Sequence, residues 1–200
     1  MSNLYAKVFA RFYDKALQRA EDKVLAERRR ALLSGLKGNI LEVGAGTGVN
    51  FQFYPKDANV LALEPSPFML KQALEKKKDN GHIRLLQSFV EDAMIQSESM
   101  DTIVCTLVLC TIPDPKKALQ FFYQWLKPGG KLIVLEHIRS PVSWRGSVQD
   151  ILTPAWKVIG EGCHLNRNTD HMIKQTGFQT LEEDYFSYLF YWYQGIFSKV

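Results

Sequence analysis

The sequence holds few cysteines, and the three that it has fit no known framework. Cys105, Cys110 and Cys163 are odd in number, and their spacing matches no zinc-binding pattern. Cys105 and Cys110 lie inside an apolar run, where a cysteine behaves as a small hydrophobic side chain. We therefore expect neither a disulfide framework nor a bound metal ion.

Long apolar runs are also missing. No stretch approaches the roughly 18 apolar residues that span a bilayer, and residues 1–7 lack the features of a secretory signal. These absences predict a cytoplasmic protein. With 200 residues, 46% of them hydrophobic, and a net charge of +4, the chain has the composition of one packed domain rather than of a disordered or fibrous protein.

The charge is unevenly distributed along the chain. Up to Lys37 there are nine basic and four acidic residues, whereas the remainder is close to neutral. Phe9, Phe12, Tyr13 and Ala16 recur at helical spacing, which predicts an amphipathic helix with its aromatic side chains turned inward. Its basic face can meet solvent or make peripheral contact with an anionic membrane surface, and we expect no nucleic-acid partner.

Short β-rich runs alternate with helical runs from Gly38 onward, which is typical of a parallel sheet covered by helices. We expect an α/β fold with a Rossmann-like, doubly wound sheet that is mostly parallel, has an antiparallel last strand and carries helices on both faces. The strands are expected at Asn39–Val43, Asn59–Glu64, Ile83–Phe89, Thr102–Leu107 and Lys131–His137, and the helices at Gly48–Phe53, Pro67–Asp79 and Lys116–Leu126.

The alternation fails after His137, and the chain up to Asn168 is interpreted as an insertion with one or two short helices. Long ordered insertions are usually functional. We expect a single domain over residues 1–200, built from an N-terminal helical lid (1–37), a cofactor-binding core (38–137), an insertion that forms a substrate cap (138–180) and two closing strands (181–200).

A glycine-rich loop follows the first expected strand, with glycines at 44, 46 and 48. Such a loop lets the backbone approach a ligand at the start of a helix. Glu42 lies just before the loop, where a carboxylate would repel the pyrophosphate of NAD but would hold the ammonium group of a methionine moiety. Glu64, at the end of the next strand, is placed to accept hydrogen bonds from two ribose hydroxyls. This pattern favours S-adenosylmethionine as the cofactor.

Four motifs between Gly38 and His137 resemble those of the class I S-adenosylmethionine-dependent methyltransferases. They are Glu42–Gly48, Leu63–Met69, Val90–Asp92 followed by Ser99–Asp101, and Leu126–Gly130. The resemblance implies that the cofactor is S-adenosyl-L-methionine and the product S-adenosyl-L-homocysteine. With the argument on the loop, it implies the following contacts to the cofactor: Tyr13, Glu42, Gly44, Ala45, Gly46, Gly48, Asn50, Glu64, Pro65, Met69, Val90, Glu91, Thr106 and Leu107.

A narrower resemblance covers more of the chain. Gly46–Pro55, Val104–Cys110, Glu136–His137 and Pro154–Cys163 are similar to segments of the membrane-associated thiol S-methyltransferases of the methyltransferase-like group. Bacterial phospholipid N-methyltransferases and quinone C-methyltransferases share the first half and an element like Tyr13–Asp14. The resemblance therefore implies a small, apolar acceptor, and leaves a thiol, an amine and a lipid-like molecule as alternatives.

Methyl transfer is an in-line displacement at a carbon that the sulfonium already activates, so the protein must mainly align the reactants and exclude water. A thiol acceptor needs a base less than an amine does. The candidates for a base are Glu136 and His137, at the carboxyl end of the fifth expected strand, and Cys163 and His164 in the insertion; of these we favour His137. The expected substrate contacts are Cys110, Trp156, Cys163 and His164.

Three other functions stay open on the sequence. An RNA or protein methyltransferase is supported by the basic N-terminal segment, although no base-methylation motif accompanies it. A protein that binds S-adenosylmethionine without turnover would carry the same loop. A NAD-dependent oxidoreductase would also carry a glycine loop, but the position of Glu42 disfavours it.

Overall fold

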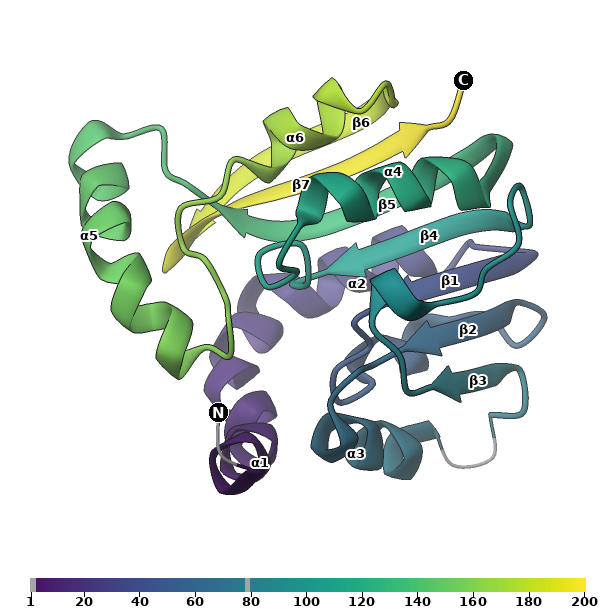
Figure 1. Cartoon of the computed structure of the whole chain (residues 1–200), viewed down its shortest axis with the longest axis horizontal. Helices are drawn as coiled ribbons and strands as arrows, with labels where there is room; N and C mark the ends of the chain where they lie inside the picture. The colour runs from purple at the N-terminus through teal and green to yellow at the C-terminus, as the bar shows by residue number, and fades with distance from the viewer. Residues whose placement is uncertain (1–2, 78–79) are drawn as a thin grey trace. The chain divides into compact units, whose positions relative to one another are not determined.

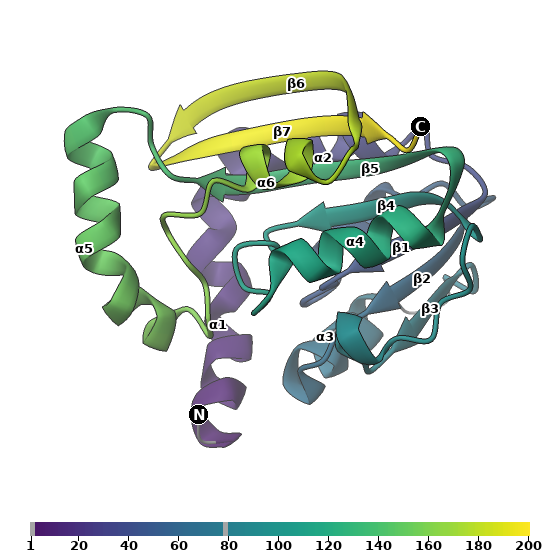
Figure 2. The ribbon, with the colours of Figure 1, turned by 45° about the horizontal axis from the view of Figure 1, so that its top comes forward.

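The structure is a computed structural model that describes residues 3–77 and 80–200 (Figures 1 and 2). The chain forms two compact units, residues 1–94 and residues 95–200, which are described in turn.

The first unit holds three parallel strands and their helices. The N-terminal helix α1 (Asn3–Ala20) continues through one π-helical segment, η1 (Glu21–Leu25), into α2 (Ala26–Leu33). Strand β2 (Asn59–Leu63) pairs in parallel with β1 (Asn39–Val43) on one side and with β3 (Ile83–Leu86) on the other. The unit is completed by α3 (Pro67–Lys77) and by two 3-10 segments, η2 (Val49–Phe53) and η3 (Val90–Asp92).

The second unit begins with two parallel strands, β4 (Met100–Thr106) and β5 (Leu126–Ile138), joined through α4 (Pro115–Trp125). The chain then passes through α5 (Ser143–Ile159) and α6 (Thr169–Gln175). It ends in β6 (Gln179–Tyr188) and β7 (Phe190–Ser198), and β7 pairs antiparallel with both β5 and β6. Helices α4 and α6 contact each other over one face of these strands (Figure 1).

The predicted fold class is confirmed: parallel strands come first and antiparallel strands close the sheet. The strand predicted at Asn39–Val43 has these bounds in the structure. The strand predicted from Ile83 ends at Leu86, and the segment predicted as a helix at residues 48–53 is a 3-10 turn. The predicted end of the second helix at Asp79 lies outside the described residues.

Two expectations about helices were wrong. The insertion contains α5, a single helix of 17 residues, in place of one or two short helices. In α1 the buried side chains are Ala10 and Ala20, while Phe12 is 52% exposed and Ala16 is also exposed. The reason is that the packed stripe of α1 runs through small residues, and Phe12 lies outside it.

Candidate functional site

The glycine loop has the backbone conformation that its sequence predicts. Gly44, Gly46 and Gly48 have φ angles of 67°, 55° and 79°, in the left-handed region that favours glycine. The amide of Ala45 donates to the carbonyl of Leu63 at 2.9 Å, which ties the loop to the end of β2. A Cβ added at Gly46 would meet no atom within 4 Å, whereas a Cβ at Gly48 would lie 2.6 Å from the Phe51 ring. The loop therefore leaves open space beside Gly46.

Glu64 is buried at the end of β2, where its carboxylate joins two backbone segments. Oε2 accepts a hydrogen bond from the amide of Gly46 at 2.8 Å, and Oε1 accepts one from the amide of Ser66 at 2.8 Å. A carboxylate oxygen has two lone pairs and can accept hydrogen bonds from more than one donor. Glu64 thus shapes the glycine loop in addition to its predicted contact with the cofactor.

Glu42 is 1% exposed and stands at the end of a chain of polar side chains. Its Oε1 accepts from Asn50 Nδ2 at 2.8 Å, and Asn50 Oδ1 in turn accepts from Arg29 Nη1 at 2.8 Å. By distance and angle, Oε2 accepts no hydrogen bond from residues 3–77 and 80–200, although the Tyr54 hydroxyl lies near enough to the carboxyl group to favour its ionised form. Burial, against the hydrogen bond from Asn50, raises the pKa of Glu42 to about 7. A buried carboxylate oxygen without a donor fits the ammonium group of a methionine moiety.

The Tyr13–Asp14 element fastens α1 to the glycine loop. Asp14 accepts a hydrogen bond from the Thr47 hydroxyl at 2.6 Å and pairs with Lys76 of α3 at 2.5 Å. Lys76 also donates to the Thr47 hydroxyl, at 3.0 Å. Tyr13 is half-buried, with its ring centroid 5.6 Å from that of Phe9. The contacts of Thr47 and Lys76 were missed in the sequence: Lys76 belongs to no motif that we used, and Thr47 lies within the Glu42–Gly48 motif but was given no role there.

The other expected cofactor contacts are divided between the two units. Pro65 is half-buried after β2, Met69 is buried on α3, and Val90 is buried in η3 beside the exposed Glu91. In the second unit, Thr106 ends β4 and is buried, and Leu107 follows it with a φ of 57°. Every one of these assignments stays a prediction.

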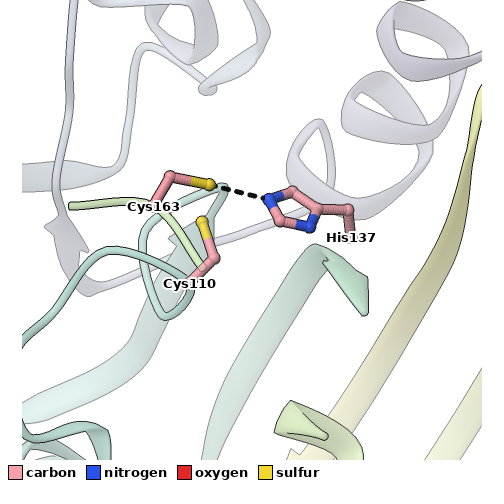
Figure 3. Close-up of side chains that lie close together, drawn as sticks. All are labelled: Cys110, His137 and Cys163. Atoms are coloured by element: carbon pink, nitrogen blue, oxygen red, sulfur yellow. Dashed lines mark hydrogen bonds between the residues drawn. The ribbon is translucent and has the colours of Figure 1, made fainter. Parts of the chain in front are cut away.

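The second unit brings together three of the predicted acceptor residues (Figure 3). His137 Nε2 lies 3.1 Å from Cys163 Sγ, and the reactive atoms of Cys110, His137 and Cys163 all lie within 4.8 Å of one another. They come from the loop after β4, from β5 and from the segment after α5. We call these residues the Cys–His–Cys cluster. The spacing of the cysteines along the chain gave no sign of it.

The three residues of the cluster have shifted pKa values, and the shift of Cys163 is opposite in direction to those of Cys110 and His137. A hydrogen bond from Cys110, and a further one with His137, hold the pKa of Cys163 well below that of a free thiol. The same contact with Cys163, together with burial, raises the pKa of Cys110. Burial has the largest influence on His137 and opposes its charged form, but the hydrogen bond to Cys163 and the negative charges of Cys163 and Glu136 together outweigh burial and raise the pKa of His137. The contacts with Cys110 and His137 therefore favour the ionised form of Cys163.

Trp156 and His164, the other predicted substrate contacts, lie next to this cluster. The Trp156 indole contributes to the low pKa of Cys163, and its ring centroid is 6.2 Å from that of Phe190. His164 contacts the carbonyl of Cys110 twice, through its amide at 2.9 Å and through Nδ1 at 3.2 Å. All five predicted acceptor residues are thus gathered in one region of the second unit.

The loop that carries Cys110 is held by two charged side chains. Glu136 is fully buried, and its Oε1 accepts hydrogen bonds from the amides of Val108 and Leu109 at 2.7 and 2.8 Å. Burial raises the pKa of Glu136 to about 7. Arg167 donates to the carbonyls of Leu109 and Ile112. Glu136 and Arg167 therefore both support the loop, and the sequence gave no signal for the contribution of Arg167.

Comparison with known proteins identifies the relatives of this chain. The methyltransferase domain family matches residues 41–134. The rat protein named thiol S-methyltransferase TMT1B is 36% identical over 173 residues, which cover 80% of this chain and 71% of the relative. The human thiol S-methyltransferase TMT1A is 33% identical over 172 residues, or 79% and 70% of the two chains. A chain in the complex between the Haloferax volcanii Trm112 methyltransferase activator and a methyltransferase has the same fold, with a TM-score of 0.73, 15% identity and 97% of each chain covered.

Proposed function

Because this chain belongs to the S-adenosylmethionine-dependent methyltransferase family, we propose that it transfers the methyl group of S-adenosyl-L-methionine to a small thiol. The observation that carries the choice of a thiol is the Cys–His–Cys cluster. It brings two thiol groups and one imidazole together in a region where Cys110 and His137 are buried. The names of the relatives TMT1A and TMT1B support the same acceptor.

The cofactor side of the reaction is assigned to the first unit. Glu42 Oε2 would accept a hydrogen bond from the ammonium group of the methionine moiety, and Glu64 would accept from the ribose hydroxyls. The backbone of Gly46 would lie against the cofactor, since the space beside it is open. The cofactor itself supplies the activated methyl group, and the role of these residues is to bind and orient it.

The acceptor side is assigned to the second unit. About 3% of a free thiol is ionised at neutral pH, which is a handicap of about 2 kcal/mol for a reaction of the thiolate. We propose that His137 contacts the acceptor sulfur and holds its proton, while Cys110, Cys163, Trp156 and His164 form the surroundings of that sulfur. Residues 138–180 would then act as a cap over the acceptor.

A thiol assay tests this proposal. The wild-type protein is expected to form the S-methyl product from a small thiol such as 2-mercaptoethanol, with S-adenosyl-L-homocysteine as the second product. His137→Asn is expected to lower kcat/KM by about 100-fold or more, because a positioned acid–base group contributes that much. His171→Asn is the matched control, since His171 is 74% exposed on α6.

Mass spectrometry of the products separates the alternatives. Methylated amine, phospholipid, RNA or protein without any S-methyl product would contradict the choice of a thiol. An unchanged rate in His137→Asn would contradict the role of His137 and leave the residue as part of the packing.

We further propose that residues 1–37 act as a lid on the cofactor side. Asp14 joins α1 to Thr47 in the glycine loop and to Lys76 on α3, and Gln72 of α3 donates to the carbonyl of Ala10 at 2.7 Å. These contacts support α1 as a fixed wall beside the loop. A wall of this kind would keep water out of the site, and methyl transfer requires that exclusion of water.

We also propose peripheral contact with an anionic membrane surface. Helix α5 would contribute to this contact in addition to α1. Among residues 3–77 and 80–200, none of the helices combines the length and apolarity needed to cross a membrane. Helix α5 extends away from the carboxyl end of β5 (Figures 1 and 2). The exposed side chains of α5 include an apolar stripe. The stripe recurs at helical spacing and consists of Trp144, Val148, Ile151, Leu152, Val158 and Ile159.

The charges beside these apolar residues favour lipid over other occupants. Arg145 lies beside the stripe with its guanidinium 5.3 Å from the Trp144 ring, and the one acid of α5, Asp150, pairs with Arg139. In the first unit, α1 exposes Leu4, Val8 and Phe12 between basic residues. Apolar residues flanked by basic ones are typical of helices that lie in a membrane interface.

Vesicle sedimentation tests the membrane contact. The wild-type protein is expected to bind vesicles of phosphatidylcholine with phosphatidylserine, less so at high salt. The double variant Ile151→Gln, Val158→Gln is expected to bind at least about 10-fold more weakly, because two apolar side chains would no longer enter the lipid. The control is Leu74→Gln, Met94→Gln, two exposed apolar residues of the first unit. A stable dimer that the α5 variant dissociates would show instead that the stripe binds a second copy.

A further inference from the structure

We propose that Cys110, His137 and Cys163 bind one Zn²⁺ ion and leave a fourth position open for the sulfur of a thiol. The metal site depends on the geometry of this cluster, and the open position for a thiol rests on the proposed function. The assignment departs from the sequence-based expectation of no metal, because the three residues meet only in the folded chain.

The distances in the cluster bracket those of a zinc site. Zn–S bonds of about 2.3 Å and Zn–N bonds of about 2.0–2.1 Å place the ligand atoms of a tetrahedral site roughly 3.5–3.8 Å apart. Here His137 Nε2 and Cys163 Sγ are 3.1 Å apart, and all three ligand atoms lie within 4.8 Å of one another. Figure 3 shows the three side chains pointing toward a common centre. Small rotations of the side chains would therefore complete the site.

The chemistry of the donor set selects the metal. Two thiolates and one imidazole suit Zn²⁺, and they do not suit Mg²⁺ or Ca²⁺, which prefer oxygen ligands. Two cysteines and one histidine, with the fourth position left to water or substrate, form the ligand set of one type of catalytic zinc site. Two thiolates also balance the charge of one Zn²⁺ ion, so that no net charge is buried.

The three ligand residues are largely buried, and surrounding side chains hold the loop of Cys110 in place. Cys110 is 2% exposed and His137 is 6% exposed, whereas Cys163 is only half-buried, so a small molecule can approach from its side. The loop that carries Cys110 is held by Glu136 and Arg167 through the amides and carbonyls described above. A ligand that its surroundings fix in place binds metal more tightly than a mobile one.

A zinc ion at this position would supply what a thiol acceptor lacks. With zinc bound, Nε2 of His137 would be a ligand and could not take up a proton, so the proton-holding role proposed for His137 above would apply to the protein without metal. The acceptor thiol would instead displace a water molecule from the metal, form an S–Zn bond and release its proton to solvent. A thiol that coordinates zinc is deprotonated outright. The acceptor would thus be held as the thiolate at neutral pH, and its methylation would yield a neutral thioether with a weaker bond to the metal.

The reduced protein (residues 1–200) can be titrated with Zn²⁺ in the presence of a chromogenic chelator, and with Co²⁺ to record its visible spectrum. We expect one equivalent of metal, a spectrum typical of tetrahedral coordination with sulfur, and a change in that spectrum when 2-mercaptoethanol is added. Cys110→Ser, Cys163→Ser and His137→Asn are each expected to weaken binding by about 100-fold or more. Cys105→Ala and His171→Asn are the controls, because they remove a cysteine and a histidine outside the cluster and should leave binding unchanged.

Several outcomes would overturn the proposal. They are no metal bound at equimolar Zn²⁺, an equal loss of binding in the controls, and a disulfide between Cys110 and Cys163 in place of a metal site. A Co²⁺ spectrum that added thiol does not change would overturn the open fourth position. Failure of the proposed function is read separately, as the absence of any S-methyl product whether or not the metal is bound.

Discussion

Replacing Glu42 by glutamine is expected to weaken the binding of S-adenosyl-L-homocysteine by about 10- to 100-fold at pH 8, since a charged hydrogen bond to a buried group is lost. Glu42 Oε2 has no donor among the described residues, so the ammonium group of the ligand would be its partner. The glutamine side chain can still accept from Asn50, but it presents a neutral amide where the ammonium would lie. The effect therefore falls on the ligand more than on the fold.

The pH dependence of binding follows from the pKa of Glu42. Burial raises this pKa from 4.5 to about 7 in the folded protein, while Arg29 lowers it and Glu64 raises it further. The ammonium group requires the ionised carboxylate, so affinity for the ligand is expected to fall as the pH drops below 7. Glu42→Gln has no such titration, and its affinity should vary little over the same range.

The stability of the protein without ligand should change in the opposite direction. Between pH 4.5 and about 7 the folded state keeps a proton on Glu42 that the unfolded chain has released. Rising pH therefore removes stability through this window, by about 3 kcal/mol once the carboxylate is ionised in both states. Glu136, with a pKa of about 7, contributes in the same sense, so the difference between the wild type and Glu42→Gln isolates the part due to Glu42.

Calorimetric titration with S-adenosyl-L-homocysteine at pH 6, 7 and 8 measures how the affinity for the ligand changes within about one unit on either side of the pKa of Glu42. Thermal unfolding without ligand at the same pH values measures how the stability of the protein changes. Glu75→Gln is the matched control, because Glu75 is exposed on α3. Equal affinity and equal pH dependence in the wild type and Glu42→Gln would show that Glu42 does not contact the cofactor.

The variants Gly46→Val and Gly48→Val are expected to lose different properties, the first ligand binding and the second stability. At Gly48 a Cβ would lie 2.6 Å from the Phe51 ring and 3.2 Å from the backbone of Ala73. The overpacking and the left-handed φ of 79° together should cost about 2–5 kcal/mol of stability. At Gly46 no atom lies within 4 Å of the added Cβ, so the cost should be nearer the 1–2 kcal/mol of backbone strain.

The side chain added at Gly46 should instead occupy the space proposed for the cofactor. Gly46→Val is therefore expected to stay folded and to lose binding of S-adenosyl-L-homocysteine by about 100-fold or more, as a steric block of a binding site would. Gly177→Val is the matched control: Gly177 has a φ of 98° with no atom near its Cβ, in the second unit. Circular dichroism gives the stability, and calorimetry gives the binding.

For Gly46→Val, we expect a small loss of stability by circular dichroism and a large loss of ligand binding by calorimetry. A Gly46→Val protein that binds the ligand as the wild type does would place the cofactor elsewhere. If Gly177→Val lost binding to the same extent, the loss in Gly46→Val would reflect strain rather than a blocked site.

The sequence by itself determined the strand β1 and the conformation of the glycine loop, because the signals there are local. Strand β1 has the predicted bounds, and the three glycines have the left-handed φ angles that a turn of this kind requires. A strand, a turn and the side chains beside it lie within about ten residues, so their arrangement follows from short-range geometry. The positions of Glu42 in β1 and of Glu64 just after β2 follow for the same reason, while their contacts with the cofactor stay a prediction.

Only the tertiary structure decided which distant residues meet and which helix faces are covered. Periodicity predicts that a helix has an apolar stripe, but it does not say whether the stripe is packed, and Phe12 of α1 and the stripe of α5 are both exposed. Cys110, His137 and Cys163 come from three separate elements, so their spacing in the sequence carries no information about their contact. They meet because the parallel pairing of β4 with β5 brings the ends of those strands together, and because the segment after α5 returns to the same place.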